Sequence, residues 1–471
     1  MEQKDINRKL DEFNRYLIGK KVAIIGLGVS NLPLIDYLYN LRCEITLFDN
    51  KELKDLSPEV REKVLEHNFE FSFGVNSLDR LKGFDIIFRS PSCLPTRKEL
   101  VDEAKRGAII TTEIEMVIEL APCMVIGVTG SDGKTTTTTL ISEILKEEGY
   151  NVFLGGNIGI PLFTRIAEMK RDDVVVLELS SFQLMNMKIS PNISVITNIT
   201  PNHLDIHKDF EEYIDAKKTI FKYQTEKDKL ILNYDNDITR SFAKEAKGKV
   251  EFFASKTKIK NGLLVDNGKI KECKSGLRYH LFDTEDMIIK GNHNYEDACA
   301  AILATRDLVK KESIDKVLKT FRGVEHRIEF VKVSKNNVKW YNDSVSSSPT
   351  RTIAGLNAFT RRNIILIAGG YDKNLDYSPI GKPIVDNCKA VILLGQTSDK
   401  IEKAINDNLK SSRKLEIYKC SSLEETVLKA NEIAAKDDIV LFSPASASFD
   451  MFKNFAERGM KFKELVRKYI K

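Results

Sequence analysis

Residues 123–137 read Cys-Met-Val-Ile-Gly-Val-Thr-Gly-Ser-Asp-Gly-Lys-Thr-Thr-Thr. The stretch begins as an apolar run of strand length, turns at glycines and continues into a threonine-rich helix start. This order of strand, glycine turn and helix is typical of a phosphate-binding loop in an α/β domain. The strict pattern has a glycine at position 128, where this chain has Val128, so the loop is a variant. We therefore predict a parallel α/β domain whose loop binds phosphate groups.

The residue types of the loop suit a nucleoside triphosphate. Glycines let backbone N–H groups surround phosphate oxygens, and a helix N-terminus favours anions. Lys134 can reach the terminal phosphates, and the Thr135 hydroxyl can ligate Mg²⁺. The alternative is an ordinary strand–helix turn with an exposed lysine. The nucleotide-binding residues predicted from the loop are Gly130, Ser131, Asp132, Gly133, Lys134, Thr135 and Thr136.

Two later strands add metal-binding side chains. The run Asp173–Gln183 contains a strand that ends in Glu178, at the place where a phosphate-loop enzyme needs a Mg²⁺ ligand or a residue that holds water. A further strand, 194–198, leads to His203. Taken alone, His203 and His207 read as surface histidines, but the position of His203 after this strand favours a ligand.

The chain repeats the order of strand, turn and helix in what look like separate units. The first unit has a strand at 21–26, a helix near 32–39 and a strand at 44–49, and the third opens with a strand at 363–370. We predict an α/β protein of three domains: 1–112, Rossmann-like; 113–322, the phosphate-loop domain with a mostly parallel sheet; and 323–471, Rossmann-like. The segment 227–290 predicts antiparallel strands added to the middle domain.

Composition excludes several classes of function. The 471 residues carry 73 Lys and Arg against 68 Asp and Glu, a balance that does not indicate nucleic-acid binding. The seven cysteines show no zinc-ligand spacing and indicate free thiols in a reducing compartment. The charged N-terminus is not a signal peptide, and no apolar run approaches the ~20 residues of a membrane span. We expect a cytoplasmic protein without membrane insertion.

The first unit also resembles a dinucleotide-binding fingerprint. Gly26-Leu-Gly28-Val-Ser-Asn31 is followed by Asp49, an acid about 20 residues on that could hold a ribose hydroxyl. Asn31 replaces the third glycine of the pattern. A nicotinamide-dependent oxidoreductase is therefore one alternative function, and a non-catalytic phosphate-loop scaffold is another.

A set of motifs in one order resembles the Mur ligase family, within a wider group that includes the folylpolyglutamate synthetases. The motifs are TGSDGKTTT, GGNIG, VLELSSFQL, NITPNHLD, YIDAKKTIF, GNHNYEDACAA, GVEHRIEF, YNDSVSSSPT, AGGYDKN and SPASASFDMFKNFAERGMKF. They span most of the chain, and the set is highly specific. The last motif and EHRIEF are most similar to the family's D-glutamate-adding members.

The resemblance implies an ATP-dependent amide ligase of peptidoglycan precursor synthesis. It would join D-glutamate to UDP-N-acetylmuramoyl-L-alanine through an acyl phosphate. Another ligase of the group, with a different amino acid, stays an alternative. Separately, we expect the chain to be a monomer.

The resemblance also assigns roles to residues. Lys134, His203, Lys217 and Arg327 would be catalytic, with Arg327 contacting the γ-phosphate. Thr135 and Glu178 would hold one Mg²⁺, and His203 a second together with a carbamylated Lys217. Asn157 and Asn294 would line the adenine site, and Asp343 would bind the ribose. Val29, Ser30, Asp49 and Asn50 would bind the UDP part, and Lys373, Ser448 and Phe455 the amino acid. Without the resemblance, Lys217 and Lys218 read as solvated helix lysines.

The sequence departs from the family pattern at two positions. Ser92 stands where many members have glycine in a Ser-Pro-Gly motif. Val345 stands where D-glutamate-adding members have a lysine that helps to hold the side-chain carboxylate of the amino acid. The Asp-Asn-Pro-Arg motif of the diaminopimelate-adding members is absent. D-Glutamate therefore remains the predicted amino acid, with Lys373 as the basic partner.

Overall fold

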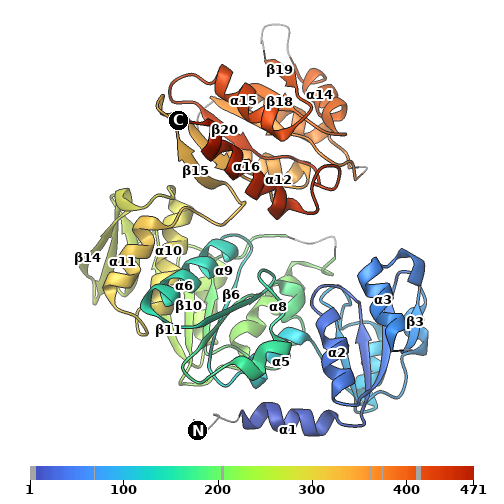
Figure 1. Ribbon diagram of the computed structural model, residues 1–471. Coiled ribbons are helices and arrows are strands. Elements are labelled where there is room, and N and C mark those ends of the chain that lie inside the picture. Colours follow the sequence, from blue (N-terminus) through green and yellow to red (C-terminus); the bar gives the residue numbers. More distant parts are fainter. Residues whose placement is uncertain (1–6, 68, 203–205, 360–362, 374, 410–414) are drawn as a thin grey trace, which may run out of the picture. The chain divides into compact units, whose positions relative to one another are not determined.

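The computed structural model describes residues 7–67, 69–202, 206–359, 363–373, 375–409 and 415–471. The chain forms two compact units, Met1–Thr320 and Phe321–Lys471 (Figure 1). Two mostly parallel sheets lie in the first unit and a third lies in the second. The predicted α/β class is confirmed. The boundaries at 112/113 and 322/323 stay a prediction.

The first sheet is wholly parallel. Its strands, in spatial order, are β3 (Glu70–Phe73), β2 (Glu44–Asp49), β1 (Lys21–Ile25), β4 (Ile86–Arg89) and β5 (Ile109–Thr111). The chain order reverses between β1 and β4, and ligands of open α/β sheets bind beyond the carboxyl ends of the strands at such a point. The expected helix and strand near residues 32–49 are confirmed as α2 (Leu32–Asn40) and β2.

The second sheet has the phosphate loop at its centre. Its strands, in spatial order, are β14 (Leu277–Asp283), β13 (Lys269–Lys274), β12 (Gly262–Asp266), β11 (Lys249–Ala254), β10 (Lys229–Asn233), β9 (Ile193–Ile196), β6 (Met124–Thr129), β8 (Val174–Glu178) and β7 (Val152–Gly156). Apolar β6 and β8 are almost wholly buried, as helices on both faces of a parallel sheet require. The β12–β14 pairs are antiparallel, as predicted for the segment 227–290.

The third sheet makes up the core of the second unit. Its strands, in spatial order, are β15 (Glu329–Val333), β16 (Lys339–Asn342), β20 (Ile439–Phe442), β17 (Ile364–Ala368), β18 (Cys388–Leu393) and β19 (Glu416–Lys419). Among the described strands of this sheet, β15 alone runs antiparallel to its neighbour. The loops that follow β16, β20 and β17 therefore leave the same edge of the sheet.

Helices connect the strands of each sheet. In the first unit they are α1 (Arg8–Leu17), α2, α3 (Pro58–Glu66), α4 (Lys98–Lys105), α5 (Glu113–Leu120), α6 (Lys134–Glu148), α7 (Ser181–Leu184), α8 (Phe210–Lys222), α9 (Asp237–Ser241), α10 (Asn292–Thr305) and α11 (Lys311–Thr320). In the second unit they are α12 (Pro349–Asn357), α13 (Gly381–Asn387), α14 (Ser398–Asn406), α15 (Leu423–Ile433) and α16 (Phe455–Tyr469). Within the described residues, none of these helices has the length and apolar character that crossing a bilayer demands.

Candidate active site

The phosphate loop occupies the turn between β6 and α6. Gly133 caps α6 with φ +79°, in the left-handed region, and a Cβ at this position would collide with the Asp297 carboxylate. The Lys134 ammonium donates to the carbonyl oxygens of Gly130 and Ser131, at 2.9 and 2.8 Å. The structure therefore contains the predicted loop. The Lys134 side chain is folded back on this loop and donates to its carbonyl oxygens.

Glu178 ends β8 beside the loop, as predicted. Its strand register places it opposite Val128, two residues before the loop begins at Gly130. The side chain is buried, and one carboxylate oxygen accepts a hydrogen bond from the Asn157 amide at 2.8 Å. The other oxygen is buried and has no hydrogen-bond partner among the described residues. A buried carboxylate oxygen left open beside a phosphate loop suits a Mg²⁺ ligand.

Lys217 projects from α8 into the interior of the loop region. Its side chain is buried, and its amine donates to the Gly130 carbonyl oxygen at 2.8 Å and to the Thr129 hydroxyl at 3.2 Å. Burial, and after it the charge of Lys134, holds the pKa of Lys217 well below its ordinary value. The surface lysine expected from residue type alone is wrong at Lys217, whereas Lys218 is partly exposed and pairs with Glu245.

The Tyr213 side chain ties α8 to the loop, and sequence reasoning missed this contact. The Tyr213 hydroxyl lies 2.9 Å from the Ser131 hydroxyl, and the Lys217 amine lies 4.7 Å from the centre of the Tyr213 ring. His207 is buried, with its Nε2 2.9 Å from the Ser181 hydroxyl, so the expectation of a surface histidine is wrong there. The predicted ligand His203 lies outside the described residues.

A second buried carboxylate beside the loop was also missed. Asp297 lies on α10, and its Oδ1 accepts a hydrogen bond from the Thr137 hydroxyl at 3.2 Å. Burial is the main cause of its pKa, which is raised well above the ordinary value. The only signal in the sequence was its position one helical turn after Asn294, within the GNHNYEDACAA motif.

The two asparagines predicted for the adenine site lie on different elements, one after a strand of the second sheet and one on a helix. Asn157 follows β7 and donates to Glu178, whereas Asn294 is in the first turn of α10 and donates to the Lys290 carbonyl oxygen at 2.8 Å. Both amides therefore bond to the protein in this structure, and their contact with a base stays a prediction.

The residues predicted for the UDP part follow neighbouring parallel strands. Val29 and Ser30 come after β1, and Val29 is 78% exposed. Asp49 ends β2, and its carboxylate accepts hydrogen bonds from the Leu27 and Lys51 amides at 2.9 and 3.0 Å, while Asn50 is exposed. The Asn31 amide, at the position of the third glycine, donates to the carbonyl oxygens of residues 25 and 26, at 3.0 and 3.1 Å.

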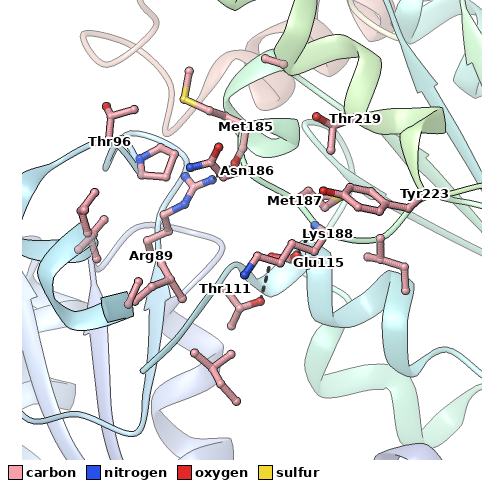
Figure 2. A pocket seen from close by; sticks show the side chains of 18 of the residues that line it. Arg89, Thr96, Thr111, Glu115, Met185, Asn186, Met187, Lys188, Thr219 and Tyr223 are labelled. Carbon is pink, nitrogen blue, oxygen red and sulfur yellow. Dashed lines mark hydrogen bonds between the residues drawn. The ribbon is translucent and has the colours of Figure 1, made fainter. Parts of the chain in front are cut away.

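A cavity of about 970 Å³ lies between the first two sheets, away from these residues. Figure 2 shows Arg89, Glu115 and Met185 among the side chains that line it. Arg89 is buried and donates to the carbonyl oxygens of Met185 and Cys93, at 2.6 and 3.2 Å. None of the predicted site residues that the structure describes lines this cavity, so we regard Arg89 as a link between the sheets.

In the second unit, Asp343 and Arg327 lie at one turn. His326 and Ile328, on either side of Arg327, have φ of 63° and 45°, and such values are strained for a β-branched residue. The Asp343 carboxylate accepts hydrogen bonds from the Ile328 amide at 3.2 Å and from the Ser346 and Ser443 hydroxyls. Burial raises the pKa of Asp343 to about 6. This carboxylate therefore holds the turn that carries Arg327.

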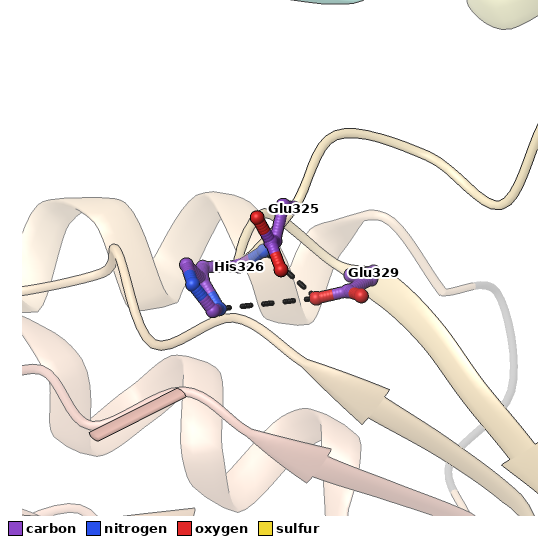
Figure 3. Close-up of side chains that lie close together, drawn as sticks. All are labelled: Glu325, His326 and Glu329. Atoms are coloured by element: carbon purple, nitrogen blue, oxygen red, sulfur yellow. Dashed lines mark hydrogen bonds and ion pairs between the residues drawn. The ribbon is translucent and has the colours of Figure 1, made fainter. Parts of the chain in front are cut away.

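Glu325, His326 and Glu329 lie close enough together to hold a metal ion (Figure 3). The Lys463 ammonium, however, donates to Glu325 at 2.6 Å and to Glu329 at 2.9 Å. One cation thus already offsets part of the negative charge of the two carboxylates, and the Glu329 carboxylate, which accepts a hydrogen bond from the His326 amide at 2.9 Å, helps to fix the Arg327 turn.

The residues predicted for the amino acid lie at the carboxyl edge of the third sheet. Ser448 is buried in the loop after β20, and Phe455, which begins α16, is 43% exposed. The ammonium of exposed Lys373 lies 5.5 Å from the centre of the Phe449 ring. The topology therefore brings these loops to one edge of the sheet.

Comparisons with known proteins agree with this architecture. Residues 128–305 match the model of the Mur ligase middle domain, and residues 326–446 match that of the Mur ligase glutamate ligase domain. The solved structure of MurF from Acinetobacter baumannii is similar with a TM-score of 0.55 at 14% identity, covering 96% of this chain and 92% of that one. The UDP-N-acetylmuramate-alanine ligase MurC from Thermotoga maritima gives 0.53 at 18% identity, covering 95% and 99%. These likenesses confirm the three-domain fold.

Sequence relatives are much closer. The UDP-N-acetylmuramoylalanine–D-glutamate ligase of Acetivibrio thermocellus is 50% identical over 464 residues, 98% of this chain and 99% of the relative. The ligase of the same name from Clostridium tetani is 48% identical over 466 residues, 98% and 100%. These relatives give no support to the oxidoreductase alternative. The motifs, the fold and these relatives together show that this chain belongs to the Mur ligase family.

Proposed function

We propose that this chain is an ATP-dependent ligase that adds D-glutamate to UDP-N-acetylmuramoyl-L-alanine in peptidoglycan precursor synthesis. The proposal draws on relatives of this name that are about half identical over nearly the whole chain. The structural observation that carries it is the meeting of Lys217 with the phosphate loop at Gly130. A buried amine held at the loop is not needed for nucleotide binding alone, and it fits a second catalytic group there.

In the proposed reaction, the γ-phosphoryl group of ATP passes to the terminal carboxylate of the alanyl residue and ADP leaves. The amine of D-glutamate then attacks the acyl carbon, loses a proton and displaces inorganic phosphate as the amide bond forms. Both steps bring anions together, so positioning and neutralisation of charge supply most of the catalysis. The loop N–H groups and Lys134 bind the phosphates, and Arg327 is proposed to contact the γ-phosphate.

The donor set fits Mg²⁺. Thr135 and Glu178 are proposed to hold one ion, and the open carboxylate oxygen of Glu178 supports this role. A second ion is proposed at His203 and Lys217, with Lys217 carbamylated. Bound Mg²⁺ would neutralise phosphate charge. A lysine with a lowered pKa is more often the uncharged amine that reacts with CO₂, which supports the modification.

Binding roles for the remaining predicted residues belong to the same proposal. Val29, Ser30, Asp49 and Asn50 would bind the UDP part, Asn157 and Asn294 the adenine, and Asp343 the ribose. Lys373, Ser448 and Phe455 would bind the amino acid. The Asp343 carboxylate already accepts a hydrogen bond from the Ile328 amide of the Arg327 turn. A ribose hydroxyl would therefore bind to a carboxylate that also holds this turn.

We also propose that the chain acts as a monomer in the cytoplasm, with domain boundaries at 112/113 and 322/323. None of the seven cysteines, all of which the structure describes, forms a disulfide, which supports a reducing compartment. Size-exclusion chromatography with light scattering tests the monomer.

The test of the function is release of phosphate from ATP and Mg²⁺ with UDP-N-acetylmuramoyl-L-alanine, across a panel of amino acids. We expect release that depends on D-glutamate, and none from Lys134→Ala although that variant stays folded. Release with a different amino acid would support the ligase activity but contradict D-glutamate as the amino acid that is added. Release from Lys134→Ala at the normal rate would remove the phosphate loop from the mechanism.

A further inference from the structure

The family resemblance leads us to expect a lysine at position 345, where this chain has Val345, and the structure brings another cation to the main chain of this residue. Val345 lies in the loop after β16. Arg351, in the first turn of α12, reaches back over this loop and its Nη1 donates to the Val345 carbonyl oxygen at 3.2 Å. We propose that Arg351 binds the side-chain carboxylate of the incoming amino acid. This inference rests on the proposed function.

The loops around Arg351 form a fixed frame. Arg458 is buried and donates to the carbonyl oxygens of Ser344, Ser446 and Ala447, at 2.9, 3.0 and 2.9 Å, so it joins the loops after β16 and β20. The Tyr371 amide donates to the Ala447 carbonyl oxygen at 3.0 Å and joins the loop after β17 to the same frame. A ligand at this edge of the sheet therefore meets side chains on a rigid support.

The Arg351 guanidinium also has N–H donors that form no hydrogen bond within the described residues. A guanidinium has five N–H donors, and Arg351 uses one of them for the Val345 carbonyl oxygen. It is exposed, and no carboxylate pairs with it among the described residues. Arg458 cannot take this role because its guanidinium is buried and bonded to the frame. The planar fork of an arginine suits a carboxylate, which it can bind through two parallel hydrogen bonds.

The position of Arg351 in its helix argues in the same direction. Cations are disfavoured at the N-terminal turn of a helix, where the helix dipole is positive, and the first turn of α12 contains no acidic residue. Nothing in the local structure of α12 thus compensates the charge of Arg351. An anion bound at this edge would compensate it.

The topology places a second cation across the frame. β20 lies between β16 and β17, so the loops of Arg351 and Lys373 flank the loop of Ser448. The two flanking strands are two strand spacings apart, about 10 Å. An acidic amino acid carries a carboxylate at each end, so it can meet a cation on either side of Ser448. This arrangement favours a dicarboxylic amino acid over one with a neutral side chain.

The test compares Arg351→Gln with the wild type, using D-glutamate and its side-chain amide, D-glutamine. We expect the KM for D-glutamate to rise about tenfold or more in Arg351→Gln, since a hydrogen bond to a charged group is lost. The KM values for ATP and for UDP-N-acetylmuramoyl-L-alanine should stay within about twofold, and the preference for D-glutamate over D-glutamine should fall. Arg351→Lys should lose less than Arg351→Gln.

Two further variants make the test specific. Val345→Lys placed in Arg351→Gln should lower the KM for D-glutamate again, because it restores a cation at the same place. Arg467→Gln removes an exposed arginine from α16 of the same unit and should leave every KM unchanged. Trp340, the only tryptophan, is buried in this unit, so its fluorescence reports whether each variant is folded.

An unchanged KM for D-glutamate in folded Arg351→Gln, with the wild type active on D-glutamate, would overturn the inference and leave the proposed function standing. A wild type that is active only with amino acids that have a neutral side chain would overturn both. A wild type that releases no phosphate with any amino acid would instead contradict the proposed function itself.

Discussion

The amine nitrogen of Lys217 lies 2.8 Å from the main-chain carbonyl oxygen of Gly130, inside the phosphate loop. A charged ammonium would be costly there, because the side chain is buried and the charge of Lys134 lies near. Both influences favour the uncharged amine. Burial and the neighbouring Lys134 charge therefore both lower the pKa of Lys217.

We expect Lys217→Ala to be inactive in the phosphate-release assay, and short carboxylates such as acetate or propionate to restore part of the activity. A free carboxylate can take the place that a carbamate on Lys217 would occupy. Lys218→Ala is the matched control, since Lys218 is the next residue of α8 and pairs with Glu245 at 2.8 Å. Full activity of Lys217→Ala without added carboxylate would make Lys217 an ordinary structural residue.

Much of this architecture could be predicted from the sequence, because the signals are local. The run from Met124 to Thr129 and the glycines after it fix a strand and a turn by their own conformational preferences. Glu178 could be placed because strand ends in a parallel sheet meet at one edge. Lys373 and Ser448 were predicted from the family resemblance, which could not show how their loops are tied together.

The features that could not be predicted depend on distant parts of the chain. Lys217 and Lys218 are adjacent in the sequence, and only the packing of α8 decides that the first is buried and the second is not. Asp297 meets Thr137 across 160 residues of chain, and no local pattern marks that contact. Arg351 is similar, since it reaches Val345 only because α12 begins where it does.

Gly133 caps the start of α6 and Gly149 its end, which allows a matched comparison. Both have positive φ, so alanine at either position costs about 1–2 kcal/mol of backbone strain. A Cβ at Gly149 meets nothing within 4 Å, whereas at Gly133 it collides with the Asp297 carboxylate. We expect Gly133→Ala to lower the free energy of unfolding more than Gly149→Ala, and to raise the KM for ATP where Gly149→Ala does not. Urea unfolding and steady-state kinetics measure the two effects. Equal losses of stability would show that Asp297 moves aside.

Asp297→Asn should change how stability depends on pH. The pKa of Asp297 is raised in the folded chain, so the folded state binds its proton more tightly than the unfolded chain does. Stability is then lost as pH rises from about 3.9, the unfolded value, through the folded pKa. Asparagine cannot ionise, and its amide oxygen can still accept the bond from Thr137. We expect Asp297→Asn to have a higher Tm than the wild type at pH 8 and a similar Tm below about pH 4.

The control for this pH dependence is Glu226→Gln, which removes an exposed carboxylate from the same unit. Its difference in Tm from the wild type should not change between the two pH values. A Tm of Asp297→Asn that lies below the wild type at pH 8 would mean that the Asp297 carboxylate is ionised and stabilising in the folded chain.

Arg89→Met should weaken the link between the first two sheets. The Arg89 guanidinium is buried at the end of β4 and bonds to the Met185 carbonyl oxygen, 96 residues further along the chain (Figure 2). Methionine fills similar space but leaves that oxygen and the Cys93 oxygen without their donor, at a cost of about 3 kcal/mol. Urea unfolding followed by circular dichroism measures this loss. Arg97→Met, at an exposed arginine that pairs with Glu99, should cost less than about 1 kcal/mol.

Because β4 leads directly into Ser90 and Ser92, we also expect Arg89→Met to raise the KM for UDP-N-acetylmuramoyl-L-alanine more than the KM for ATP. Equal changes in both KM values would mean that Arg89 supports the fold as a whole and not the edge of the first sheet where we propose that UDP binds.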